Sequence, residues 1–318
     1  MGKEGRCLKY KGELMDSFFK MLSTQALMLV YMCVGFYCKK KQIIDKPTEV
    51  KLTDFVLQIT MPCMVFNSFN MDLTVDFIRE ASFCLALSFA ICGTGWLAGK
   101  FIYNRYPVEK KSILQYATLV NNCGFLGLPI VSSILGEEGL VLAAIFIIPN
   151  RIFMWTAGIS IFSKESENKT KALLKVMLNP CMIAVYLGLL QAAVHVPIPE
   201  FAQKALTGLG NCTTPISMLL IGSMLTALTL DSFKDWSIIY YGFIRLAALP
   251  IFALVLMKAF GANDVLVSCG VILTAMPAGS TTALLAQKYG ADAAYGTKIV
   301  LTSVLLSMIS IPLITLLV

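Results

Sequence analysis

Ten apolar segments, each of about 20 residues, constrain this sequence more than any other feature. An apolar segment of that length spans the hydrocarbon core of a bilayer, roughly 30 Å, as an α-helix. Only 14% of the 318 residues are charged, whereas soluble domains carry about 25%. The sequence therefore predicts an all-α, polytopic membrane protein with ten transmembrane helices in one membrane domain. The segments cover residues 16–38, 53–71, 81–103, 112–135, 139–162, 172–194, 204–229, 236–258, 264–287 and 294–317.

The charged residues lie mainly between the apolar segments. Residues 1–14 are polar, and we expect them to be disordered; residues 163–171 are expected to form a short cytoplasmic linker. Lysines and arginines concentrate in the connections after the first, third, fifth, seventh and ninth segments, as in Lys39, Lys40 and Lys41. Under the positive-inside rule these connections face the cytoplasm, so both termini should lie outside it, in a cell-membrane protein. This distribution accounts for the net charge of +7 without a nucleic-acid partner.

The cysteines and the single histidine, His195, show no metal-ligand spacing. No CxxC pair is present, and most cysteines lie inside apolar segments, where a thiol behaves as a small apolar side chain. We therefore expect neither a metal site nor a cofactor. The sequence also lacks a paired-aspartate metal motif, a histidine cluster and a GxSxG motif, so an enzyme is not expected.

The two halves of the chain resemble each other in order and spacing. Residues 60–64 (TMPCM) in the second segment correspond to residues 214–218 (TPISM) in the seventh, and Gly136 closes the fourth segment as Gly290 closes the ninth. Because each half holds five segments, the halves would lie in opposite orientations, as in the inverted repeats of secondary transporters. Chance similarity between apolar helices is the alternative. The predicted repeats cover residues 15–162 and 172–318.

Helix-breaking residues interrupt the fourth and ninth segments at matching positions. These are residues 121–129 (NNCGFLGLP) and residues 275–282 (AMPAGSTT). Within a helix, Gly costs about 1 kcal/mol and Pro about 3 kcal/mol, so both segments should unwind. Unwound backbone is tolerated at membrane depth only where it is buried in protein or lines a watery cavity. Each break exposes the positive amino end of a half-helix, and two such ends would form an anion site.

The candidate substrate-binding residues follow from these breaks. Arg151 and Arg245 join them because each lies about 15 Å from a helix end, where charged side chains often mark a pathway. No Asp or Glu lies at comparable depth in the sequence, which favours anionic cargo. The alternatives are that the small residues only permit close helix packing, and that each arginine caps backbone carbonyls. The candidates at the breaks are Asn121, Asn122, Gly124, Gly127, Pro129, Pro277, Gly279, Ser280 and Thr281, with Thr282 beside them.

At these breaks the sequence resembles the auxin efflux carrier family of membrane transport proteins, which includes the plant PIN-type carriers. The resemblance covers residues 15–318. Plant members often have a proline where Asn121 stands, and the long cytoplasmic domain of some plant carriers is absent. These departures leave auxin itself unsupported as the cargo, whereas the single short loop and the basic inner face look bacterial. The similar motifs are residues 275–279 (AMPAG) and 286–289 (AQKY) in the ninth helix, residues 122–129 (NCGFLGLP) in the fourth, and residues 311–313 (IPL) with Thr297 and Ser303 in the last.

The resemblance implies a bundle of ten helices in two inverted repeats. Helices one, two, six and seven would form a scaffold that pairs two protomers through helices two and seven. The remaining helices would carry the crossover and move against the scaffold like an elevator. The implied cargo is a small carboxylate.

Taken together, these features predict a secondary transporter that exports a small organic anion, driven by membrane potential or a proton gradient. The alternative is a sodium-coupled organic-anion symporter of the bile-acid type, which has a similar fold. Its sodium ligands could be Ser, Thr and Asn oxygens, although deep carboxylates are missing. A sensor or channel-like protein that binds an anion without translocating it is a third interpretation.

Overall fold

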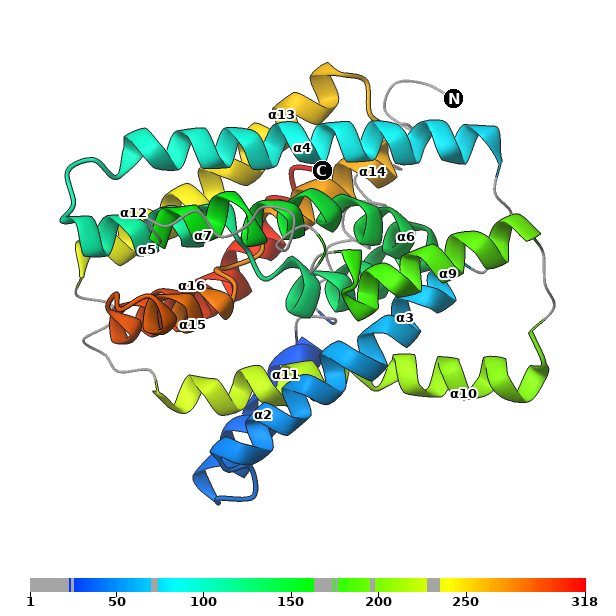
Figure 1. Ribbon diagram of the computed structural model, residues 1–318, viewed down its shortest axis with the longest axis horizontal. Helices are drawn as coiled ribbons and strands as arrows, with labels where there is room; N and C mark the ends of the chain where they lie inside the picture. Colours follow the sequence, from blue (N-terminus) through cyan, green and yellow to red (C-terminus); the bar gives the residue numbers. More distant parts are fainter. Residues whose placement is uncertain are drawn as a thin grey trace, which may run out of the picture.

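The computed structural model describes residues 23, 26–69, 74–162, 174, 177–194, 198–227 and 235–318. The predicted segments 1–14 and 163–171 lie outside the described residues, as does His195. Within the described ranges the regular elements are helices (Figure 1). Residues 26–40 form the first helix. It is followed by α2 (Lys46–Phe55), α3 (Met61–Ser68), α4 (Val75–Ile102), α5 (Val108–Leu119), α6 (Leu128–Trp155), α7 (Ala157–Phe162), α9 (Pro180–Val194), α10 (Glu200–Asn211), α11 (Thr213–Met224), α12 (Trp236–Phe243), α13 (Leu249–Ala259), α14 (Asp264–Thr274), α15 (Thr281–Lys288) and α16 (Ala293–Thr315).

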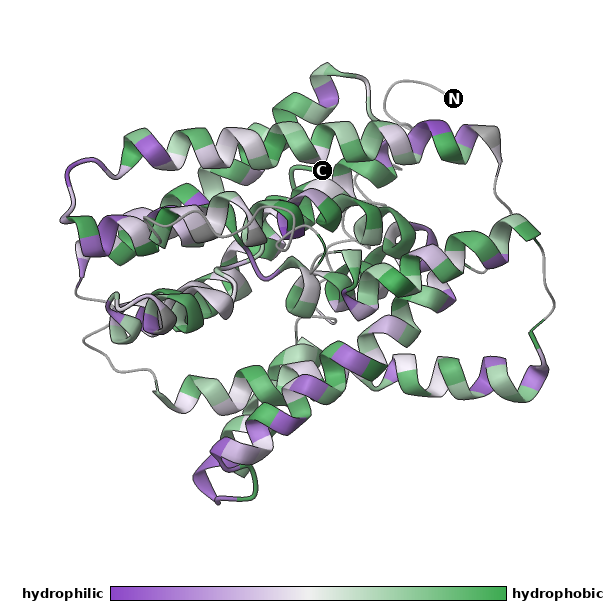
Figure 2. Ribbon diagram, in the orientation of Figure 1, coloured by the Kyte–Doolittle hydropathy of each residue, from purple (hydrophilic) through white to green (hydrophobic). Residues whose placement is uncertain are grey.

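The described helices overlap the predicted apolar segments, although their boundaries differ at places. Four helical stretches of the described chain are long and apolar enough to cross a membrane: Asp76–Ile102, Cys123–Met154, Trp236–Ala259 and Ala293–Thr315. Figure 2 shows apolar residues along α4, α9 and α13, and hydrophilic residues at helix ends and connections. These are the features of a polytopic membrane protein. The ten-helix inverted repeat stays a prediction.

Three helix boundaries depend on single residues. The helix of the second segment begins at Lys46 rather than near residue 53, because the Asp45 side chain caps it by accepting a hydrogen bond from the N–H of Thr48 (2.9 Å). Gly136, with φ 66°, interrupts α6 at the boundary between the predicted fourth and fifth segments. Gly290, at the matching position after α15, has φ 72°. Both backbones are left-handed, a conformation that glycine adopts without steric cost.

Three wide π-helical turns each end immediately before a proline-containing helix start. They are η1 (Val56–Thr60), η2 (Cys123–Gly127) and η5 (Ile244–Ala248). In each, the residue before the proline donates its N–H to the carbonyl five residues earlier, as Leu249 does to Ile244. A proline removes one N–H and its ring clashes with the carbonyl four residues earlier, so the wider turn accommodates it. η2 and η5 both lie at the candidate site.

The helices pack into two groups. In the first group, α2 contacts α11, and α3 contacts α9 and α10; these helices occupy the lower and right parts of Figure 1. In the second group, α6 contacts α4, α7 and α14, and α16 contacts α12, α14 and α15. The groups meet where α3 packs on α6 and where α11 packs on η2. The contact of α11 with η2 therefore lies at the break that the sequence predicts in the fourth segment.

The first helix and α11 cross with their backbones in contact. A Cβ atom on Gly35 would overlap the carbonyl oxygen of Leu219, and one on Gly222 would overlap the carbonyl oxygen of Met32. Glycine at both positions permits the close approach, as small residues commonly do between membrane helices. The first helix therefore belongs to the same group as α11.

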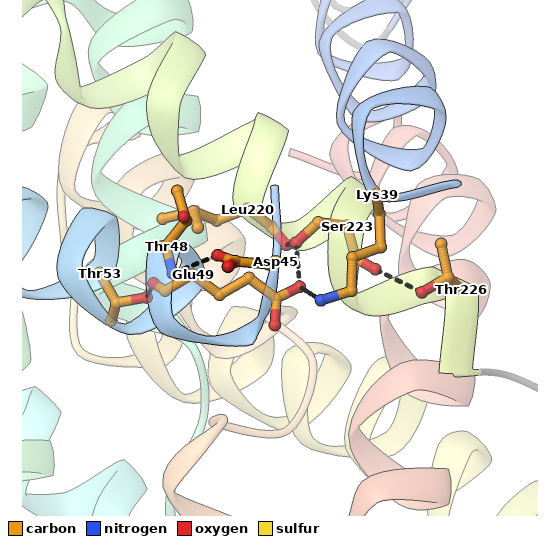
Figure 3. Close-up of polar contacts among 8 residues, drawn as sticks. All are labelled: Lys39, Asp45, Thr48, Glu49, Thr53, Leu220, Ser223 and Thr226. Carbon is orange, nitrogen blue, oxygen red and sulfur yellow. Dashed lines mark hydrogen bonds and ion pairs between the residues drawn. The ribbon is translucent and has the colours of Figure 1, made fainter. Parts of the chain in front are cut away.

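Glu49 joins three helices beside this crossing (Figure 3). Its carboxylate accepts a hydrogen bond from Ser223 Oγ (2.7 Å) and lies 3.0 Å from Lys39 Nζ. Only 12% of the Glu49 side chain is exposed. The hydropathy segments placed this residue in a connection, but the cap at Asp45 extends α2 over it. It ties α2 to the first helix and to α11.

Candidate functional site

Two unwound segments cross inside the bundle, one after α5 and one between α14 and α15. Asn121 and Ala278 form an isolated antiparallel β-bridge. The N–H of Asn122 donates to the carbonyl of Pro277 (2.8 Å), and the N–H of Gly279 donates to the carbonyl of Val120 (3.1 Å). These bonds satisfy backbone groups that the breaks release from their helices. Both breaks agree with the sequence prediction, and their direct pairing is new information from the structure.

Small residues let the two segments approach each other. A Cβ atom on Gly279 would lie 3.3 Å from the carbonyl oxygen of Asn121, and one on Gly127 would lie 2.7 Å from a leucine side chain of α14. Both glycines are buried, and so are Pro129 and Pro277. These four candidates therefore shape the breaks and the crossing.

Two helix starts lie at the crossing. η2 and α6 continue from Asn122, and α15 begins at Thr281 after Ser280. The first N–H groups of a helix have no acceptor within it, so each start carries a partial positive charge. Asn122 is largely buried, whereas Ser280 is exposed. Backbone donors from both halves of the chain are thus available at one place.

Neighbouring side chains position the start of α15. The hydroxyl of Tyr116 on α5 donates to Thr281 Oγ1 (3.0 Å), and Ser303 Oγ on α16 accepts from the N–H of Ala278 (3.1 Å). Thr282 Oγ1 is buried and has no hydrogen-bond partner in the described part of the chain. α15 is thus held from two sides, by α5 and by α16.

Arg245 binds the backbone of both breaks. Its Nε donates to the carbonyl of Met276 (3.1 Å) and its Nη1 donates to the carbonyl of Thr118 (2.9 Å). Only 4% of Arg245 is exposed. The sequence left open that a deep arginine caps backbone carbonyls, and both of these hydrogen bonds of Arg245 are of that kind. Its guanidinium fastens the segment after α14 to the end of α5.

Arg151, on α6, lies against the start of η2. Its Nη2 is 3.0 Å from the position that a Cβ atom would take on Gly124, so the missing side chain makes room for the guanidinium. Its Nε is buried and has no hydrogen-bond partner among the residues that the structure describes. A buried donor on a cation is costly while unpaired. An anion beside η2 would pair with it.

A small cavity lies beside the crossing, with Asn121, Asn150, Arg245 and Thr274 in its lining. Its volume of about 20 Å³ suits about one water molecule and not an organic anion. The Asn121 side chain donates to the carbonyl of Leu273, while its Oδ1 is buried without a partner in the described ranges. Within those ranges no cluster of three or more His, Cys, Asp or Glu residues could hold a metal ion.

Most of the candidate residues come together at this crossing, but sequence reasoning missed several neighbours. Asn150 is 8% exposed and its Nδ2 donates to the carbonyl of Leu119 (3.2 Å). Its polar side chain within an apolar segment, next to Arg151, is the signal that could have identified it. Tyr116 gave no such signal, because an aromatic residue in an apolar helix is ordinarily a core residue.

Comparisons with known proteins find similarity to membrane transport proteins. A family model described as membrane transport protein matches residues 22–315. An uncharacterized transporter of Methanocaldococcus jannaschii is 25% identical over 274 residues, which are 84% of this chain and 88% of the relative. An uncharacterized transporter of Methanothermobacter thermautotrophicus is 23% identical over 305 residues, which are 93% and 98% of the two chains. The uncharacterized transporter YfdV of Escherichia coli K12 is 21% identical over 296 residues, 90% and 93% of the two chains.

Proposed function

Because the chain belongs to the auxin efflux carrier family of membrane transport proteins, we propose that it exports a small organic carboxylate anion across the cell membrane. The observation that carries the proposal is the unpaired guanidinium N–H of Arg151 beside Gly124, at the start of a broken helix. A carboxylate placed there would accept from Arg151 and from backbone N–H groups at the starts of η2 and α15.

The two deep arginines would have different roles in this site. Arg151 contacts the anion, because its Nε has no partner in the described chain. Arg245 positions the site, because its guanidinium is engaged with the carbonyls of Thr118 and Met276. Asn122, Ser280 and Thr281 complete the site with side-chain hydrogen-bond groups.

Movement of the anion would follow the division of the helices into two groups. The group with α4–α7 and α12–α16 contains the crossing, and we propose that it moves as an elevator against the group with α2, α3, α9, α10 and α11. The resemblance supports a homodimer through the second and seventh helices, here α2–α3 and α10–α11, both in the stationary group. The orientation with both termini outside the cytoplasm rests on the distribution of lysines and arginines.

Current recording from proteoliposomes tests the proposal directly. Purified protein is challenged with a panel of mono- and dicarboxylates, with and without sodium and a pH gradient. We expect a current with at least one carboxylate that persists without sodium, and its loss in Asn122→Ala and Pro277→Ala. Ser82→Ala is the matched control, because its hydroxyl bonds only the carbonyl of Ile78 in its own helix. Unchanged transport in both crossover variants would exclude this site.

A sodium-coupled organic-anion symporter is the second candidate. It is favoured by two buried oxygens, Asn121 Oδ1 and Thr282 Oγ1, that have no hydrogen-bond partner in the described ranges, since oxygens of this kind can bind sodium. In the same experiment, a current that appears only with sodium would support this candidate over an uncoupled or proton-driven carrier.

A further inference from the structure

The last carbonyls of α5 are all occupied. The hydroxyl of Tyr241 donates to the carbonyl of Ala117 (3.0 Å), Arg245 donates to that of Thr118 (2.9 Å), and Asn150 donates to that of Leu119 (3.2 Å). The carbonyl of Val120 accepts from the N–H of Gly279 across the crossing. The negative end of α5 is therefore fully capped by groups from α12, η5, α6 and the segment between α14 and α15.

Arg245 is the charged member of this cap, and it also reaches the second break. Its Nε donates to the carbonyl of Met276, two residues after the end of α14. The carboxyl ends of two helices thus converge on one guanidinium, which keeps its positive charge in any protein environment. Its ionisable neighbours include Tyr241, Cys123, Cys92 and Tyr103, whose thiols and phenols are ordinarily neutral at pH 7. In the described chain its counter-charge is therefore supplied by carbonyl dipoles.

Carbonyls of this kind have another use in transporters with discontinuous helices. Unwound backbone and the carboxyl ends of half-helices coordinate the coupling sodium ion there. Here the corresponding carbonyls, of Thr118 and Met276, accept hydrogen bonds from Arg245. The π-turn η5, next to Pro250, places this side chain between them. We propose that Arg245 is a resident cation of the crossing, which takes the place of a coupling sodium ion, so that the protein needs no sodium to order its two breaks. The link to a transport cycle rests on the proposed function, whereas the test below measures stability alone.

The test compares the thermal unfolding of purified protein in sodium chloride, choline chloride and low millimolar guanidinium chloride. For the unsubstituted protein we expect the same Tm in sodium and choline. Arg245→Ala removes the cation and frees the two carbonyls, so its Tm should fall. Guanidinium or sodium should then raise its Tm relative to choline, because either small cation can occupy the vacated place.

Arg151→Ala is the matched control. It also removes a deep arginine, but one whose buried Nε has no hydrogen-bond partner in the described ranges, so small cations should leave its Tm unchanged. If Arg245→Ala does not fold, Arg245→Gln serves instead, since it keeps one donor group while removing the charge and the second donor nitrogen. A rise of Tm in the unsubstituted protein that is specific to sodium would overturn the proposal. So would a folded Arg245 variant whose Tm does not change with small cations, or an equal rise of Tm in Arg151→Ala. Failure to find a transported carboxylate would overturn the proposed function and leave this inference standing.

Discussion

Arg151 Nη2 lies 3.0 Å from the position that a Cβ atom would take on Gly124. In Gly124→Ala the arginine can turn away while the site is empty, but it has to take an off-rotamer position to hold an anion, which costs about 1 kcal/mol, or about fivefold in an equilibrium constant. We expect the apparent affinity for the anion to fall by about this factor with unchanged Tm. The concentration dependence of anion flux measures it. Gly93→Ala, where a Cβ atom meets nothing within 4 Å, is the control and should keep its affinity.

Arg151→Gln should weaken anion binding more strongly. A hydrogen bond to a charged group contributes about 1.5–3 kcal/mol, which corresponds to a loss of about 10- to 100-fold in affinity. Arg151→Lys should lie between, because an ammonium keeps the charge and loses the planar fork. Neither variant should lower the Tm of the unliganded protein, since Nε has no partner in the described chain. Flux with the same concentration dependence in all three proteins would remove Arg151 from the site.

Gly222→Ala should destabilise the protein without touching the crossover. A new Cβ atom would overlap the carbonyl oxygen of Met32, and because both helices meet through backbone, no side chain can move aside. Overpacking costs about 1–3 kcal/mol or more, so the Tm should fall clearly in a thermal unfolding experiment. Gly208→Ala on α10 meets nothing within 4 Å and should be neutral or slightly stabilising. An unchanged Tm in Gly222→Ala would contradict the backbone crossing.

We expect the folded protein to lose stability in acid because the carboxylate of Asp235 becomes protonated. Burial opposes its ionisation, but hydrogen bonds from Lys110 and Ser237 outweigh this, and the pKa of Asp235 lies below its ordinary value. A folded-state pKa that is depressed stabilises the protein above the unfolded-state pKa, and this stabilisation is lost as pH falls through the folded-state pKa. Because Asn caps a helix about as well as Asp, Asp235→Asn removes mainly the ion pair with Lys110 and should cost about 0.5 kcal/mol at neutral pH, the usual contribution of a partly exposed pair.

The measurement is Tm as a function of pH from neutral to strongly acid. The curves of the two proteins should converge at the acid end, where Asp235 is protonated in both. Curves that stay parallel throughout would show that the carboxylate contributes through its shape alone.

The sequence predicts the positions of the breaks because the causes are local. Helix is disfavoured by proline at positions 129 and 277 and by glycine at positions 124 and 279, whatever their tertiary surroundings. For the same reason the boundary at Gly136 could be read from the sequence and is where the structure shows a positive φ. Caps are equally local, so the extension of α2 from Asp45 over Glu49 could have been predicted, but hydropathy alone overlooks it.

The partners of the deep polar groups could not be predicted in this way. Arg245 binds the carbonyl of Thr118, which is 127 residues away in the chain, and Asn121 pairs with Ala278 across the two halves. A backbone carbonyl carries no signature in a sequence, so nothing distinguishes an arginine that caps helix ends from one that faces a substrate. The partners of Arg151 and Arg245 are therefore distinguished only by the structure.

The bridge between Asn121 and Ala278 has a consequence for the order in which the protein is made. The N–H of Asn122 and the carbonyl of Val120 find their partners only after Pro277 and Gly279 have been synthesised, and each unmet backbone group inside a bilayer costs several kcal/mol. We expect a fragment of residues 1–162 to be degraded rapidly in cells and to be rescued by co-expression of residues 163–318, as pulse-chase labelling would measure; equal half-lives would contradict this. The crossing therefore closes only late in synthesis, once the segment between α14 and α15 has entered the membrane.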